Sequence, residues 1–187
     1  MIKERSPKLH GLLRRNFDDS DLFLFESAFE YAAASGGLLE VDFERDPLAS
    51  YNPRPARIAQ IVFEDAQQTE ADVLAAAILA SSSDVSGLTA ERFGSAGDIA
   101  RKACELCPAR LVELEPGADS AAAAIFAAMW LDRARHLHLA PPQRLAAVDE
   151  EFLNDTQKIA SEFQRHAPRI AELVDAWLQR RLRQASR

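Results

Sequence analysis

Apolar residues recur along most of this chain at the spacing of an α-helix. Ile58, Ile61 and Val62 share one face of a segment that Pro55 can open, and a later segment reads A-A-A-I-L-A, with no polar side at all. A helix that is apolar all round is expected to be buried at the centre of its fold. The pattern predicts helices over residues 20–35, 55–67, 69–81, 95–106, 118–138, 143–166 and 168–185, with a short turn at 89–94. The expected fold class is therefore all-α, a single-domain helical bundle.

Polar residues at the segment ends predict where several helices begin. Ser20 is expected to cap the first helix, Thr69 with Asp72 resembles a capping box, and Ser95 with Asp98 is expected to cap a later helix. Residues 1–18 are expected to form a partly ordered arm ahead of a domain over 19–187. Residues 38–53, rich in Asp, Pro and Asn, show no sustained period and are expected to be loop.

Composition narrows the function classes. The net charge of −7 argues against general nucleic-acid binding, which relies on clustered Lys and Arg. No apolar stretch is long enough for a transmembrane helix, and the N-terminus lacks a signal-peptide pattern, so no membrane role and a cytoplasmic location are expected. The two cysteines, Cys104 and Cys107, form a C-x-x-C without a second ligand pair or a preceding strand. They are interpreted as buried helical cysteines one turn apart.

Three segments contain sequence motifs that are characteristic in their order and spacing. The first reads Y-N-P-R-P at residues 51–55 and continues A-R-I-A-Q-I-V-F-E-D, the second reads A-A-A-I-L-A-S-S-S-D, and the third reads M-W-L-D-R-A-R-H-L-H. In this order and spacing they resemble the HD-domain hydrolases of the RelA/SpoT type, which hydrolyse guanosine polyphosphates. Those enzymes show PYxxHPxxVAxIL, AALLHDxxED and LADRLHN at the corresponding places. The resemblance covers roughly residues 20–140, is looser over 143–185, and implies the HD-type helical topology.

The resemblance also implies a metal site, most of which is missing here. In that family two His and two Asp hold a divalent metal, and the metal lowers the pKa of a bound water. Arg54 stands at the first His position, and the His-Asp doublet falls on Ala80 and Ser81. Asp84 matches the first residue of the family's acidic pair, and Asp132 alone matches a ligand. The vestigial pocket that the resemblance implies is therefore lined by Arg54, Ser81, Asp84, Asp132 and Arg133.

Neither a metal nor another cofactor is expected in this pocket. A guanidinium cannot coordinate a metal, so Arg54 is expected to form an ion pair with Asp132 in the place of the lost cation. A relocated metal site would have to use Asp84, Asp132 and His136, with manganese or zinc. Asp132 and His136 are four residues apart and share a helix face, whereas His138 lies on another face.

The favoured function is that of a pseudoenzyme, a catalytically degenerate HD-type domain with no catalytic residues. It would bind an anionic nucleotide, through the fork of Arg54, or a protein partner. The first alternative is a residual metal-dependent phosphohydrolase acting on a guanosine polyphosphate or a similar nucleotide. The second is a structural or interaction protein, which could form an oligomer. Its candidate surface is an apolar stripe that is itself expected to pack on the domain: Ile170, Leu173, Val174, Trp177 and Leu178.

Overall fold

The computed structural model describes residues 1–36, 48, 52–115, 117–139 and 142–185, and within these ranges it contains helices and turns but no strand. The prediction of an all-α, single-domain helical bundle is confirmed. The α-helices are α1 (Ile2–Arg5), α2 (Pro7–Asn16), α3 (Asp19–Ala34), α4 (Arg54–Gln60), α5 (Ala71–Leu79), α6 (Ala90–Phe93), α7 (Ser95–Glu105), α8 (Pro108–Glu113), α9 (Ser120–His136), α10 (Pro142–His166) and α11 (Pro168–Ala185). The π-helix η1 (Ile61–Asp65) has wider turns than an α-helix, and the 3₁₀-helices η2 (Val85–Gly87) and η3 (Leu137–Leu139) have tighter ones.

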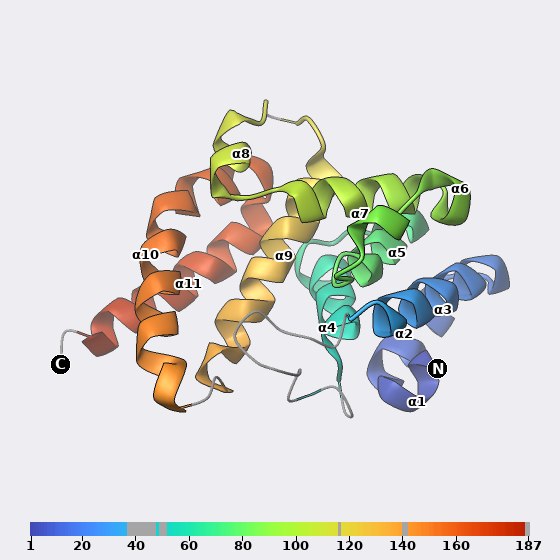
Figure 1. Ribbon diagram of the computed structural model, residues 1–187, viewed down its shortest axis with the longest axis horizontal. Coiled ribbons are helices and arrows are strands. Elements are labelled where there is room, and N and C mark those ends of the chain that lie inside the picture. The colour runs from blue at the N-terminus through green and yellow to red at the C-terminus, as the bar shows by residue number, and fades with distance from the viewer. Residues whose placement is uncertain (37–47, 49–51, 116, 140–141, 186–187) are drawn as a thin grey trace.

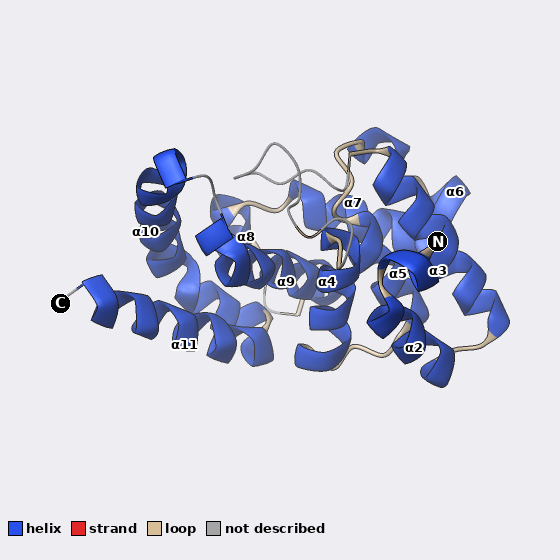
Figure 2. Cartoon of the chain, turned by 90° about the horizontal axis from the view of Figure 1, so that it is seen from below, coloured by secondary structure: helices blue, strands red, loops and turns tan. Residues whose placement is uncertain are grey.

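Helix α9 joins the two halves of the bundle (Figure 1). It packs against α4, α5 and α7 on one side and against α10 and α11 on the other. Figure 2, which views the molecule from below, shows the same division, with the N-terminus near one end of the molecule and the C-terminus at the other. A residue on α9 can therefore contact both groups of helices.

Helix α5 is the buried helix that the pattern predicted. Every residue from Val73 to Ala80 is buried, and the helix packs against α3, α4 and α7. Alanine side chains let these neighbours approach closely, because the distance between packed helices depends on the side chains at the contact. This tight centre fixes the position of α4 relative to α9.

The predicted arm at residues 1–18 is wrong, because most of this segment is helical and packed. Helices α1 and α2 bury Ile2, Leu9, Leu12 and Leu13 against the core. The backbone N–H of Ile2 donates to the Glu26 carboxylate on α3 at 3.1 Å. A four-residue helix such as α1 is stable only with such tertiary contacts, which no local pattern reveals.

Three of the predicted helix caps are also wrong. The N-cap of α3 is Asp18, whose side chain accepts from the N–H groups of Ser20 at 2.8 Å and Asp21 at 3.0 Å. No capping box forms at α5, because the carboxylate of Asp72 accepts a hydrogen bond from the hydroxyl of Ser95. That contact joins the beginnings of α5 and α7, and it takes both side chains away from the capping roles expected for them.

The remaining segments follow the predicted order with local differences. The helix expected over 55–67 changes to the wider π-helix η1 after Gln60, and α8 was not expected. The loop expected over 38–53 lies mostly outside the described residues. Helices α9, α10 and α11 stand where the pattern placed them.

The apolar stripe of α11 packs on the domain, as predicted. Ile170, Val174 and Leu178 are buried, and Leu173 and Trp177 are half-buried. The stripe faces α9 and α10, with which α11 makes its main contacts. These side chains therefore belong to the packed interior of the domain and do not form an exposed surface for a partner protein.

None of the helices in the described ranges combines the length and the apolar character that a membrane crossing requires.

Candidate functional site

A buried ion pair joins α4 to α9 at Asp132, the residue that the sequence resemblance aligns with a metal ligand. Arg57 Nε donates to Asp132 Oδ1 at 2.7 Å, and Arg57 Nη2 donates to Asp132 Oδ2 at 2.9 Å. Arg57 is 4% exposed and Asp132 is 0% exposed. The two parallel hydrogen bonds form the bidentate geometry in which a guanidinium binds a carboxylate most strongly.

The local sequence explains why both charges are buried. Residues 55–60 of α4 are all buried, and Asp132 follows a run of buried residues on α9. An isolated charge in such a place would cost several kcal/mol, about 3–5 when only one partner of a buried pair remains. A further donor of Arg57, Nη1, binds the backbone carbonyl of Asn52 at 3.0 Å. The pair is thus tied to the chain just before α4.

His136 completes the cluster from the next turn of α9. Its Nδ1 lies 2.8 Å from the carbonyl oxygen of Asp132 and 3.2 Å from Asp132 Oδ1. Both neighbours are acceptors, so Nδ1 must carry a proton and donate. The imidazole is partly exposed, at 22%, while Asp132 beneath it is closed off from solvent.

The electrostatics of the cluster favour its charged form. Burial acts to raise the pKa of Asp132, but hydrogen bonds from His136 and Arg57 outweigh it and hold that pKa below its usual value. Burial likewise acts to lower the pKa of His136, but the Asp132 carboxylate outweighs it and the pKa of His136 is raised. The carboxylate is therefore stabilised by a permanent cation on one side and by an imidazole on the other.

The predicted ion pair between Arg54 and Asp132 is wrong. Arg54 is the first residue of α4, one turn before Arg57, and no ion pair joins it to Asp132. Its positive charge instead acts on the Cys104 thiol, whose pKa is raised by burial to about 11 and lowered in part by Arg54. The Cys104 Sγ donates to the carbonyl of Ala80 at 3.4 Å. Cys104 is half-buried and Cys107 is exposed, so the prediction of two buried cysteines is wrong.

Ser81 and Asp84 form hydrogen bonds with residues that are near them in the sequence, and Asp84 also binds Tyr31 on α3. The Ser81 hydroxyl donates to the carbonyl of Ile78 at 2.9 Å and is buried. Asp84 caps η2 and accepts from the Tyr31 hydroxyl at 2.8 Å and from Ser86 at 2.6 Å. These donors lower the pKa of Asp84, with Ser86 contributing most. Neither side chain hydrogen-bonds to Asp132.

Arg133, the last residue of the predicted pocket, points to a different neighbour. Its guanidinium lies over the ring of Phe152 on α10, 4.6 Å from the ring centroid. Of the five predicted pocket residues, Asp132 alone belongs to the buried cluster with Arg57 and His136.

The structure does not assemble the alternative metal set. Within the described ranges, no group of three or more His, Cys, Asp and Glu side chains is close enough to hold a metal ion. Asp132 and His136 are neighbours, but Asp84 is held by Tyr31 and Ser86. Both carboxylate oxygens of Asp132 also accept hydrogen bonds from Arg57, whose positive charge would repel a metal ion at this position.

The sequence interpretation missed Arg57, although a signal was present. Arg57 directly precedes Ile58 and lies one turn before Ile61, so it falls on the edge of the apolar face of its helix. A charged residue at such a position is seldom fully buried unless it is paired. Arg54 lies one turn before Ile58 and satisfied the same criterion, so the pattern could not distinguish the two.

Comparison with known proteins found no matching family model, no matching curated protein and no matching solved structure. The likeness to HD-domain hydrolases thus rests on the three sequence segments.

Proposed function

We propose that this chain is a catalytically degenerate domain of the HD type, which acts by binding and not by metal-dependent hydrolysis. The observation that supports it best is the bidentate ion pair between Arg57 and Asp132. The resemblance aligns Asp132 with a metal ligand of the family. Here a guanidinium from the protein itself stands beside that carboxylate and supplies the positive charge that a metal would bring.

The energetics of the pair support this proposal. A metal at Asp132 would be repelled by the adjacent Arg57 guanidinium, and displacing Arg57 would leave a guanidinium buried at 4% exposure without its carboxylate. Breaking a buried pair in this way costs about 3–5 kcal/mol. The two His positions of the family pattern hold Arg54 and Ala80. Neither side chain can coordinate a metal, so no additional metal–ligand bond would offset that cost.

The residual phosphohydrolase is less well supported. A catalytic metal needs about three protein ligands and an open position for water. Within the described ranges Asp132 and His136 provide two neighbouring ligand side chains, and His136 Nδ1 is already hydrogen-bonded to Asp132. Under the proposed binding function, the ligand is an anionic nucleotide or a protein partner.

Metal content measured on tag-free protein tests the proposal. We expect no stoichiometric metal by elemental analysis, no 1:1 heat with manganese or zinc in calorimetry, and no metal-stimulated release of phosphate or pyrophosphate from guanosine tetraphosphate. His136→Gln serves as the matched variant, because it removes a candidate ligand while leaving the ion pair of Arg57 and Asp132 in place. About one tightly bound metal per chain that is lost in His136→Gln would contradict the proposal.

A further inference from the structure

A cavity of about 190 Å³ lies where α10 ends and α11 begins, beside the first turns of α9 and the residues that follow η1. It is somewhat larger than a cavity of about 150 Å³ that holds one benzene molecule in the engineered interior of another protein. It is smaller than the roughly 300–1,000 Å³ of a site for a drug-sized molecule. The cavity therefore has room for one molecule of little more than benzene's size.

His166, the last residue of α10, lines this cavity without a hydrogen-bond partner for its ring. The residue is 8% exposed, and both ring nitrogens are closed off from solvent with no partner among the residues that the structure describes. An imidazole carries at least one N–H donor, and a buried polar group without a partner is costly and rare in folded proteins. A polar group of a ligand in the cavity can supply the partner that the protein does not.

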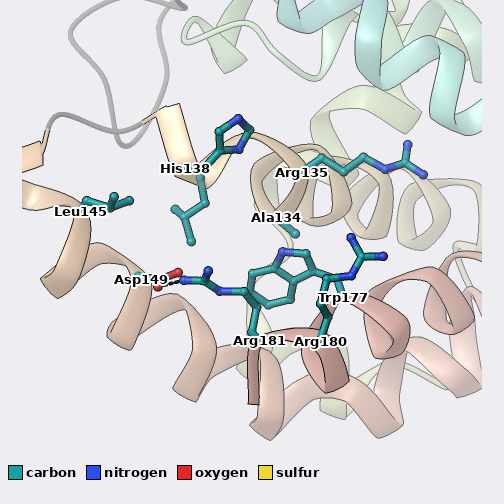
Figure 3. A pocket seen from close by; sticks show the side chains of 9 residues that line it. Ala134, Arg135, His138, Leu145, Asp149, Trp177, Arg180 and Arg181 are labelled. Carbon is teal, nitrogen blue, oxygen red and sulfur yellow. Dashed lines mark ion pairs between the residues drawn. The ribbon is translucent and has the colours of Figure 1, made fainter. Parts of the chain in front are cut away.

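The cavity shown in Figure 3 lacks such a group. It measures about 400 Å³ and lies between the end of α9, α10 and α11. On the described part of its wall, no buried side chain is left without a hydrogen-bond partner. Arg181 pairs there with Asp149, and the ring of Trp177 stands between Arg181 and Arg180 (Figure 3). The smaller cavity beside His166 is therefore the better candidate for a ligand.

The surroundings of this imidazole favour an anion. Among the described residues on the cavity wall none is Asp or Glu, and Arg169 is an exposed cation on it. The wall also includes Ser120 and Pro168, the first residues of α9 and α11. Neither preceding residue caps its helix, because Asp119 makes no capping hydrogen bond and Ala167 has no polar side chain. Helix starts carry unpaired N–H groups and a partial positive charge, which bind anions well.

Two residues with unusual backbone angles shape the wall. In the described part of the chain, the non-glycine residues with positive φ are Gln67 at 56° and Asp119 at 46°. They directly precede Gln68 and Ser120, which both line the cavity. Such angles are uncommon, and they are found where the surrounding structure demands them, often beside a ligand. The Asp119 carboxylate itself pairs with Lys102 and does not line the cavity.

The rest of the wall favours an organic ligand over an inorganic anion. Its apolar residues are Ala66, Ala124, Ala167, Pro168 and Ile170. Ala124, Ala167 and Ile170 are buried. Inorganic phosphate has no apolar surface to bury against these side chains, whereas an aromatic ring or a short aliphatic chain does.

We infer that this cavity binds a small monocarboxylate with an apolar body, of about the size of benzoate. The carboxylate accepts a hydrogen bond from the ring of His166 and lies beside the two helix starts, and the apolar body packs against Ala124 and Ile170. The inference goes beyond the proposed function, because no residue of the buried cluster around Asp132 lines this cavity. A metal bound at Asp132 would overturn the proposed function and leave this inference untouched.

Nuclear magnetic resonance of the imidazole rings in the full chain, titrated at constant pH, tests the inference. The chain has four histidines, so the signal of His166 can be assigned from its loss in His166→Phe. We expect sodium benzoate to shift that signal along a single-site curve, with a Kd of about 1 mM or tighter, which a ligand of this size can reach. Benzamide, which lacks the charge, and inorganic phosphate, which lacks the apolar body, should each bind at least about tenfold more weakly.

Substitutions on the wall locate the ligand, with binding followed on backbone amide signals. Ala124→Leu fills part of the cavity, and His166→Phe keeps a ring there without an N–H donor, so each should weaken benzoate binding at least about tenfold. Arg169→Glu should weaken it at least about fivefold, because it reverses a charge on the wall. Arg180→Glu is the matched control, since Arg180 is also an exposed arginine of α11 but lines the cavity of Figure 3; its effect should stay within about twofold.

The inference is overturned if benzoate shifts no imidazole signal, which would mean that the cavity holds only water, or if it shifts a histidine other than His166. It is also overturned if benzamide or phosphate binds as tightly as benzoate, or if Arg169→Glu and Arg180→Glu weaken binding equally. Circular dichroism checks that Ala124→Leu and His166→Phe are folded. The wild-type titrations and the variants of the exposed Arg169 and Arg180 decide the question even if either of them is not.

Discussion

Arg57 binds Asp132 across the contact between α4 and α9, with both carboxylate oxygens accepting from one guanidinium at 2.7 and 2.9 Å. The sequence pattern pointed to Arg54, one helical turn earlier on α4. This difference of one helical turn changes the burial of the arginine, because residues 55–60 of α4 are buried, whereas Arg54 at its first position is half-buried. The cation that faces Asp132 is thus the one inside the helix packing.

Breaking this pair from either side should destabilise the protein strongly. Arg57→Met or Asp132→Leu alone should lower the free energy of unfolding by about 3–5 kcal/mol, because each leaves one buried charge without its partner. The double variant should lose much less than the sum, since two apolar side chains can pack where the pair stood. Urea unfolding followed by circular dichroism measures all three values.

The exposed pair of Lys8 and Glu64 is the control for that cycle. Its atoms are 3.1 Å apart, but the Lys8 side chain is 67% exposed, so Lys8→Met should change stability little. Losses that simply add in the double variant of Arg57 and Asp132 would show that the two side chains act independently.

Stability should depend on pH through His136 and Asp132. The raised pKa of His136 contributes stability that is complete below the unfolded value of about 6.5 and is lost as pH rises through the folded value. The lowered pKa of Asp132 contributes stability above its unfolded value, which is lost as pH falls below about 4. Stability should therefore decline on both sides of a maximum near about pH 5–6 as far as these two groups contribute.

His136→Gln isolates the alkaline side of that profile. In urea unfolding between about pH 6 and 8.5, the variant should lose the decline that the wild type shows, because glutamine does not titrate. His10→Gln, on α2, should keep the slope of the wild type. Equal slopes in the wild type and His136→Gln would mean that His136 does not act on stability through its charge.

The two cysteines should differ sharply in reactivity. Cys104 is half-buried, its Sγ donates to Ala80, and burial raises its pKa to about 11, so little thiolate forms near pH 8. Cys107 is exposed at the N-cap of α8. We expect one thiol per folded chain to react rapidly with a disulfide reagent, and Cys107→Ser to abolish the rapid phase. A rapid phase that persists in Cys107→Ser would place Cys104 in contact with solvent.

Two glycines should respond to alanine in opposite directions. A Cβ on Gly97 would lie 2.5 Å from the backbone oxygen of Thr89, so Gly97→Ala should cost about 1–3 kcal/mol as α7 moves away from the start of α6. A Cβ on Gly11, inside α2, meets no atom within 4 Å, and Gly11→Ala should stabilise by about 0.5–1 kcal/mol. Thermal and urea unfolding of the two variants measure both signs, and a gain at Gly97 would contradict the close contact.

Helix positions were predictable where the reason for the helix lies in the local sequence. Helix α5 is apolar on every side, and α11 carries a continuous apolar stripe that begins at Ile170, just after Pro168, so both could be recognised from spacing. Helix α1 could not, because it has four residues and depends on Glu26. The capping residues failed for a related reason: Asp72 and Ser95 are 23 residues apart in sequence, yet they bind each other.

The sequence by itself determined the all-α class, the buried centre at α5 and the packing of α11, because hydrophobic periodicity is a local property. Only the tertiary structure decided that Arg57 and not Arg54 binds Asp132, that Asp84 stays with Tyr31, and that Trp177, Arg180 and Arg135 surround one cavity. These pairings depend on the rotation and register of packed helices. A shift of one residue turns a side chain by about 100°, which is enough to exchange one partner for another.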